Sequence, residues 1–174
     1  MKIAAQESVK QRRGRRSEPV IIFSVAHQTF AIAADSVQEI RSTDSIGGAA
    51  IGFEQSEVAK VRHTVERAHR TYYVVNAGMH FGLPVTRPTL VLILRQLRAA
   101  ILVDRIERMT EISGVYPLPQ GFTGGERRWY RGLAYLDDHV FPVIQPTGFL
   151  TGSEFERLDR AHAAQRELEG AVQA

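Results

Sequence analysis

The chain has 174 residues, of which 44% are hydrophobic, which is typical of one compact domain or of two small ones that share a core. It contains no cysteine, which excludes disulfides, thiolate nucleophiles and cysteine-based zinc or iron–sulfur sites. No stretch approaches the roughly 20 apolar residues that cross a bilayer, and the N-terminus lacks the apolar core of a secretory signal. We therefore expect a cytoplasmic protein that is not embedded in a membrane.

The net charge of +3 is unevenly distributed along the chain. Residues 1–19 hold six basic and two acidic side chains, a net charge of +4, so the other 155 residues together carry −1. Such a basic segment can bind nucleic acid or an anionic membrane. We favour a solvated, disordered arm over residues 1–18, because no aromatic side chain is interleaved with the charges.

Short apolar runs separated by turn residues begin at Pro19. In the first half of the chain, strands are expected over residues 20–25, 29–34, 36–42, 58–67 and 71–76. The first two strands flank a tight turn at His27 and predict a hairpin. Residues 42–57 are rich in glycine and serine and predict a loop.

The second half of the chain repeats this alternation of strands and turns. Residues 89–104 and 129–146 predict two further hairpins, separated by a loop over residues 116–128. Many short strands between turn signals indicate an all-β sandwich or barrel. Residues 152–174 are expected to form a helix that begins with Ser153 and Glu156 spaced as a capping box.

Shifting the chain by 69 residues superposes these patterns. FSV at 23–25 meets LIL at 92–94, AIAADSV at 31–37 meets AILVDRI at 100–106, and YYVVN at 72–76 meets FPVIQ at 141–145. This constant offset predicts two copies of one β unit of about five strands. Asp35 and Asp104 occupy the same position in the two copies, which favours a local backbone role such as a turn or cap over a catalytic one.

Motifs for catalysis or cofactor binding are not found in the sequence. The six histidines are scattered without metal-ligand spacing, the serines lack a G-x-S-x-G elbow, and GGAAIG at 47–52 does not match a phosphate-binding loop. The sequence therefore predicts no metal, no cofactor and no enzymatic activity, and the function is expected to reside in the surfaces.

Four segments in this order resemble the CheW family of bacterial chemosensory coupling proteins. They are FSVAHQTFAIAADSVQEIRSTDSI, YYVVNAGMHFGLP, AAILVDRIERMTEI and YRGLAYLDDHVFPVIQPTGFL, and the similarity covers roughly residues 19–166. The most specific pieces are LVD before a second strand and RG-x-A-x-L before PVI.

The resemblance implies two SH3-like, five-stranded β-barrels that share a hydrophobic core, followed by a C-terminal α-helix. The expected boundaries are a basic arm over 1–18, a CheW-like domain of two intertwined subdomains over 19–151, and the helix over 152–174. The implied function is that of a non-catalytic adaptor between the cytoplasmic tip of a chemoreceptor and the regulatory domain of a CheA-type histidine kinase. A divergent scaffold in a pilus or other non-flagellar pathway, or nucleic-acid binding through the arm, remain alternatives.

The family uses the stretch VQEI at its partner surface, so the resemblance implies Val37 and Glu39 as partner-binding residues. Val37 would supply apolar burial and Glu39 a charge that sets orientation. Packing of Val37 beneath its own barrel is the equally weighted alternative.

The sequence departs from the family pattern over residues 63–69, HTVERAH. His63 stands where glycine is expected, Ala68 replaces the arginine associated with receptor contact, and His69 replaces the following glycine. Asn76 replaces the usual aspartate. These departures predict a retained scaffold with one altered docking surface.

Overall fold

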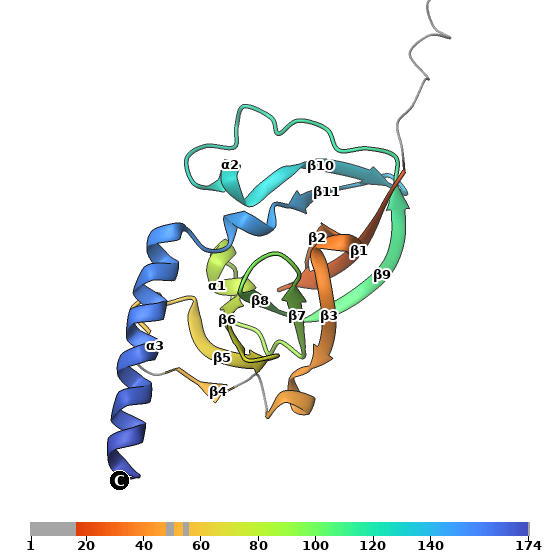
Figure 1. Cartoon of the computed structure of the whole chain (residues 1–174). Coiled ribbons are helices and arrows are strands. Elements are labelled where there is room, and N and C mark those ends of the chain that lie inside the picture. The colour runs from red at the N-terminus through yellow and green to blue at the C-terminus, as the bar shows by residue number, and fades with distance from the viewer. Residues whose placement is uncertain (1–16, 48–50, 54–55, 174) are drawn as a thin grey trace, which may run out of the picture.

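The computed structural model describes residues 17–47, 51–53 and 56–173 of the chain. Two β-sheets form the body, and one long helix, α3 (Gly152–Val172), runs along one side of it (Figure 1). The predicted basic arm lies outside the described residues apart from Ser17 and Glu18.

The first sheet, sheet A, has five strands in the order β10-β11-β2-β1-β9. They are β1 (Glu18–Val25), β2 (Gln28–Ala33), β9 (Arg105–Ile112), β10 (Tyr130–Leu136) and β11 (His139–Ile144). Neighbouring strands are antiparallel except for the parallel pair of β11 and β2. Residues 20–25 of β1 are all buried, as expected for an apolar run with both faces covered.

The second sheet, sheet B, has six strands in the order β3-β7-β8-β6-β5-β4. They are β3 (Val37–Ser42), β4 (Ile51–Gly52), β5 (Val61–Arg67), β6 (Arg70–Asn76), β7 (Leu90–Leu94) and β8 (Ala99–Val103). Here β6 and β8 form the parallel pair. The short β4 lies inside the segment predicted as a loop. Short helical turns connect the strands, namely η2 (Ala34–Ser36), η3 (Thr43–Ile46), α1 (Ala77–Phe81), α2 (Glu126–Trp129) and η4 (Pro146–Gly148).

The predicted duplication is confirmed by the strand boundaries. Adding 69 to the bounds of β5, Val61–Arg67, gives those of β10, Tyr130–Leu136. The turn after each of these strands has two residues with positive φ, Ala68-His69 in the first copy and Asp137-Asp138 in the second. Two positive φ values match the twist of the flanking strands, so the two copies share their turn geometry as well as their apolar pattern.

The two copies exchange strands. Sheet A combines β1 and β2 of the first copy with β9, β10 and β11 of the second, and sheet B combines β7 and β8 with β3, β5 and β6. The offset of 69 therefore maps the strand order of sheet A onto the first five strands of sheet B. One buried cluster spans both sheets and includes Phe23, Ile32, Tyr73, Leu92 and Ile101.

The predicted fold class is confirmed, with differences in detail. Two sheets share one core and a C-terminal helix follows, but sheet B gains the two-residue β4. Each set of pairings forms an open row of strands and not a closed barrel. An isolated bridge between Tyr116 and Leu133 links the segment after β9 to β10, and so draws the two edges of sheet A together.

The capping box of α3 lies two residues earlier than predicted. Thr151, not Ser153, is the N-cap: its Oγ1 accepts from the Glu154 N–H at 3.2 Å, and Glu154 Oε2 accepts from the Thr151 N–H at 2.8 Å. Farther along, Asp159 accepts hydrogen bonds from Tyr73 (2.6 Å) and from both terminal nitrogens of Arg98 (3.0 and 2.7 Å). These contacts hold the first half of α3 against sheet B.

Candidate partner-binding surface

Glu39 lies on an edge of sheet B. Its strand, β3, is the first in the sheet order and, among the strands of the described residues, pairs with β7 alone. Glu39 is partly exposed, whereas Val37 is 8% exposed and belongs to the shared core. Of the two roles left open for Val37, its burial supports packing, while a role at a partner surface stays a prediction. Glu39 is the residue of this pair whose side chain reaches the surface.

The carboxylate of Glu39 contacts the guanidinium groups of Arg41 and Arg67. Arg41 is on the same strand, but Arg67 is the last residue of β5, near the opposite end of the sheet order. The ion pair therefore links the edge strand β3 to the last-but-one strand, β5, across a curled sheet. The resemblance placed the expected arginine at position 68, and in this chain the guanidinium comes from the preceding residue.

A related ion pair joins the edges of sheet A. Arg108 Nη2 of β9 lies 2.6 Å from Asp137 Oδ2 in the turn that follows β10. The offset of 69 relates Glu39 to Arg108, so the same position of β3 and β9 carries opposite charges in the two copies. Each sheet therefore has an ion pair that starts from an edge strand. The charged group on β3 is the carboxylate of Glu39, and the one on β9 is the guanidinium of Arg108. The offset locates Arg108 but not its partner, because Arg67 corresponds to Leu136 and Asp137 corresponds to Ala68.

The other departures from the family pattern lie in β5, in the turn after it and at the end of β6. His63 is partly exposed in β5 and pairs across the sheet with Gly52 and Val74, while His69 is exposed in the turn. Asn76 is the N-cap of α1, where its Oδ1 accepts from the Met79 N–H at 3.0 Å. Because Asn and Asp cap helices equally well, this departure preserves the local structure.

Asp104 lies where the chain crosses from β8 of sheet B to β9 of sheet A. Its Oδ2 accepts from the Ala26 N–H at 2.7 Å, and its Oδ1 accepts from the Thr86 hydroxyl at 2.6 Å. Its own N–H donates to the Ser24 carbonyl oxygen at 3.0 Å. The carboxylate therefore connects segments that are distant in the sequence. The predicted role in a local turn or cap is wrong for this side chain.

Asp35 marks the other crossing, in η2 between β2 and β3, but its carboxylate is exposed. Within the described residues its carboxylate makes no hydrogen bond, while its backbone oxygen accepts from Arg95 Nε at 2.9 Å. The two related aspartates thus have unequal structural roles.

We expect Asp104→Ala to lower the free energy of unfolding by about 2 kcal/mol, because it leaves the Ala26 N–H and the Thr86 hydroxyl without their acceptor. Urea unfolding followed by circular dichroism measures this change. The matched control, Asp35→Ala, removes a carboxylate that makes no hydrogen bond within the described residues, and we expect a change below about 0.5 kcal/mol. Equal losses in the two variants would contradict the assignment.

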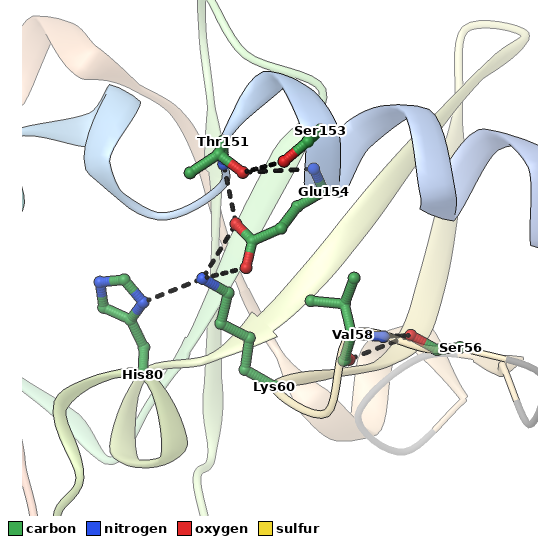
Figure 2. Close-up of polar contacts among 7 residues, drawn as sticks. All are labelled: Ser56, Val58, Lys60, His80, Thr151, Ser153 and Glu154. Atoms are coloured by element: carbon green, nitrogen blue, oxygen red, sulfur yellow. Dashed lines mark hydrogen bonds and ion pairs between the residues drawn. The ribbon is translucent and has the colours of Figure 1, made fainter. Parts of the chain in front are cut away.

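A second polar cluster holds the start of α3 to the body (Figure 2). Lys60 Nζ lies 3.1 and 3.2 Å from the two carboxylate oxygens of Glu154 and 3.4 Å from Nδ1 of His80. His80 is 7% exposed, and its ring centroid lies 4.6 Å from that of Trp129 and 4.9 Å from that of Phe149. Burial, reinforced by the positive charge of Lys60, lowers the pKa of His80 to about 4.

The described part of the chain contains no cluster of histidine and carboxylate side chains able to hold a metal ion. Within the same residues, no helix is long and apolar enough to span a bilayer.

The geometry defines a duplicated β-scaffold whose edge strands present charged side chains. A family model of the CheW-like domain matches residues 19–154, and the chain belongs to this family. The crystal structure of the scaffolding protein TtCheW from Thermoanaerobacter tengcongensis is similar in fold, with a TM-score of 0.66 at 15% sequence identity. The match covers 79% of this chain and 95% of that one. Comparison with curated proteins gives no match.

Proposed function

We propose that the protein is a non-catalytic adaptor of a chemosensory pathway in the cytoplasm. In this role it couples the cytoplasmic tip of a chemoreceptor to the regulatory domain of a CheA-type histidine kinase. The observation that carries the proposal is the exposed edge strand β3 of a CheW-like domain, with Glu39 at its surface. Edge strands bind partners through their free backbone groups, and side chains beside them select the partner.

In this proposal Glu39 sets the orientation of the partner. Its carboxylate is held by Arg41 and Arg67, so it is fixed in place before a partner arrives. A fixed charge at the rim of an interface favours the correct partner and rejects like charges. Val37 anchors the start of β3 in the core and so fixes the position of that edge.

The altered segment 63–69 supports a divergent pathway, such as one that controls pili or another non-flagellar output. His63 and His69 bring imidazole rings to positions where the family pattern has glycine, and Ala68 removes an arginine. A receptor or kinase that docks beside β5 must accommodate these side chains. The cognate partners are therefore expected to differ from those of adaptors with the usual segment.

Charge reversal of Glu39 tests the proposal. We expect Glu39→Lys to weaken binding to the regulatory domain of the CheA-type kinase from the same organism by about tenfold or more, measured by isothermal titration calorimetry. This single variant also breaks the contact with Arg67. The double variant Glu39→Lys with Arg67→Glu restores one of the two ion pairs with reversed charges, while Arg41 then faces a like charge, and we expect it to recover part of the lost stability but not binding.

Glu167→Lys is the matched control, because it reverses an exposed charge on α3 that makes no ion pair within the described residues. Its binding is expected to stay within about twofold of the original. Full binding by the double variant, or equal losses in the control and in Glu39→Lys, would refute the site.

A further inference from the structure

A hollow of about 840 Å³ lies between α2, the start of β10, η4 and the first turn of α3. We call it the arginine groove. Its charged lining consists of four basic side chains and one acidic side chain, namely Lys60, Arg127, Arg128, Arg131 and Glu154. No lining residue belongs to β3, so the groove is separate from the surface that carries Glu39.

Two of the four basic side chains are already neutralised by acidic partners. Lys60, which lines the groove, is paired with Glu154, which lines it too (Figure 2). Arg131 forms a two-point contact with Glu18, at 2.5 and 3.1 Å. These pairs leave little net charge at their own positions.

The other two basic side chains, Arg127 and Arg128, retain their charge. Arg127 Nη1 donates to the carbonyl oxygens of Pro119 and Phe122, at 3.2 and 2.8 Å, which are neutral acceptors. Within the described residues, the side chain of Arg128 makes no hydrogen bond or ion pair. Glu126, in the same helical turn, does not line the groove. The rim therefore carries two uncompensated positive charges.

The wall that carries these charges is rigid. A Cβ at Gly148 of η4 would lie 2.2 Å from the Arg128 carbonyl oxygen, so the two backbones are in direct contact. The Gln145 N–H donates to the Trp129 carbonyl oxygen at 2.8 Å. The Trp129 ring packs on His80 and is itself partly exposed. A preorganised wall with an aromatic surface lowers the entropic cost of binding an extended peptide.

We propose that the arginine groove binds a short acidic segment of a partner protein. Two carboxylates of the segment pair with Arg127 and Arg128, and an apolar side chain packs on Trp129. A long polyanion such as nucleic acid fits the surface less well, because nucleic acid is bound through many phosphate contacts, whereas the groove offers two uncompensated charges and residues 20–174 carry a net charge of −1. The adaptor thus has a second docking site that works independently of β3.

Binding of fluorescein-labelled decaglutamate to the full chain tests this proposal, measured by fluorescence anisotropy at about 50 mM salt, where screening is weak. We expect Arg128→Glu to lower the affinity about tenfold, because a charge-assisted contact becomes a repulsion. The matched control is Arg160→Glu, which makes the same charge change at an exposed position of α3 without an ion pair in the described residues. We expect it to lower the affinity less than about threefold.

A labelled ten-residue oligothymidylate is titrated in parallel, and all variants retain the basic arm, so its contribution is common to every comparison. Loss of decaglutamate binding that is specific to Arg128→Glu supports the groove. Three results overturn the proposal: no measurable decaglutamate binding, equal losses in the two variants, or an equally Arg128-dependent binding of the oligonucleotide. Because Glu39 is unchanged throughout, none of these results bears on the kinase interface.

Discussion

Gly132→Ala is expected to destabilise the protein by about 3 kcal/mol or more, because there is no space for one additional methyl group. A Cβ at Gly132 would lie 2.1 Å from the Tyr116 carbonyl oxygen and 2.6 Å from Cγ1 of Val115. Tyr116 cannot move away freely, since its backbone exchanges hydrogen bonds of 2.8 and 2.9 Å with Leu133. Urea unfolding followed by tryptophan fluorescence measures the loss.

Gly121→Ala provides the matched control for this steric argument. Nothing lies within 4 Å of a Cβ at Gly121, and its φ is not in the left-handed region. We expect a change below about 0.5 kcal/mol. If Gly132→Ala proved equally mild, the bridge between the segment after β9 and β10 would not be as tight as the structure shows. The glycine of the RG-x-A-x-L motif is therefore explained by backbone contact across the sheet.

The second large effect is a dependence of stability on pH between about 6.5 and 4. His80 is neutral in the folded protein because burial, together with the charge of Lys60, lowers its pKa from 6.5 to about 4. In this window the unfolded chain binds a proton that the folded chain does not, so stability falls as the pH falls. The stabilisation is complete above pH 6.5, and about 3 kcal/mol is lost by pH 4.

Replacing the imidazole isolates this effect. His80→Gln keeps an acceptor for Lys60 but cannot titrate, so we expect the difference in unfolding free energy between the two proteins to change by about 3 kcal/mol across the window. Asp159 contributes at lower pH, because the guanidinium of Arg98 holds the pKa of that carboxyl below its ordinary value of 3.8. Parallel pH profiles for the two proteins would rule out His80 as the source.

Local features of the fold could be predicted from the sequence. Hairpins at His27 and Asp137 were found because apolar runs flank turn residues, and both turns have positive φ. The offset of 69 predicted the duplication, since related strands keep a similar order of apolar and turn residues in the sequence. The capping box was misplaced because Ser153–Glu156 and Thr151–Glu154 have the same spacing, and only the structure shows which residue is extended.

The pairing between the copies could not be predicted. The apolar pattern of a hairpin is the same whether it pairs with strands of its own copy or of the other copy. Which strands it pairs with depends on contacts between residues far apart in the sequence. The contacts of the candidate surface could not be predicted from the sequence either. Glu39 was found through the resemblance, but Arg67 contacts it only because sheet B curls, and the arginine groove needs η4 and α3 to pack beside α2.

The exchange of strands has a consequence for how such a chain can arise. A single copy, ending before β7, holds β1 and β2 of one sheet and β3, β5 and β6 of the other, so it completes neither. Two identical copies would complete both sheets by domain swapping, as a symmetric homodimer. The present protein has the arrangement that such a dimer would have if it were fused into one polypeptide, and its two related edge strands carry the opposite charges of Glu39 and Arg108.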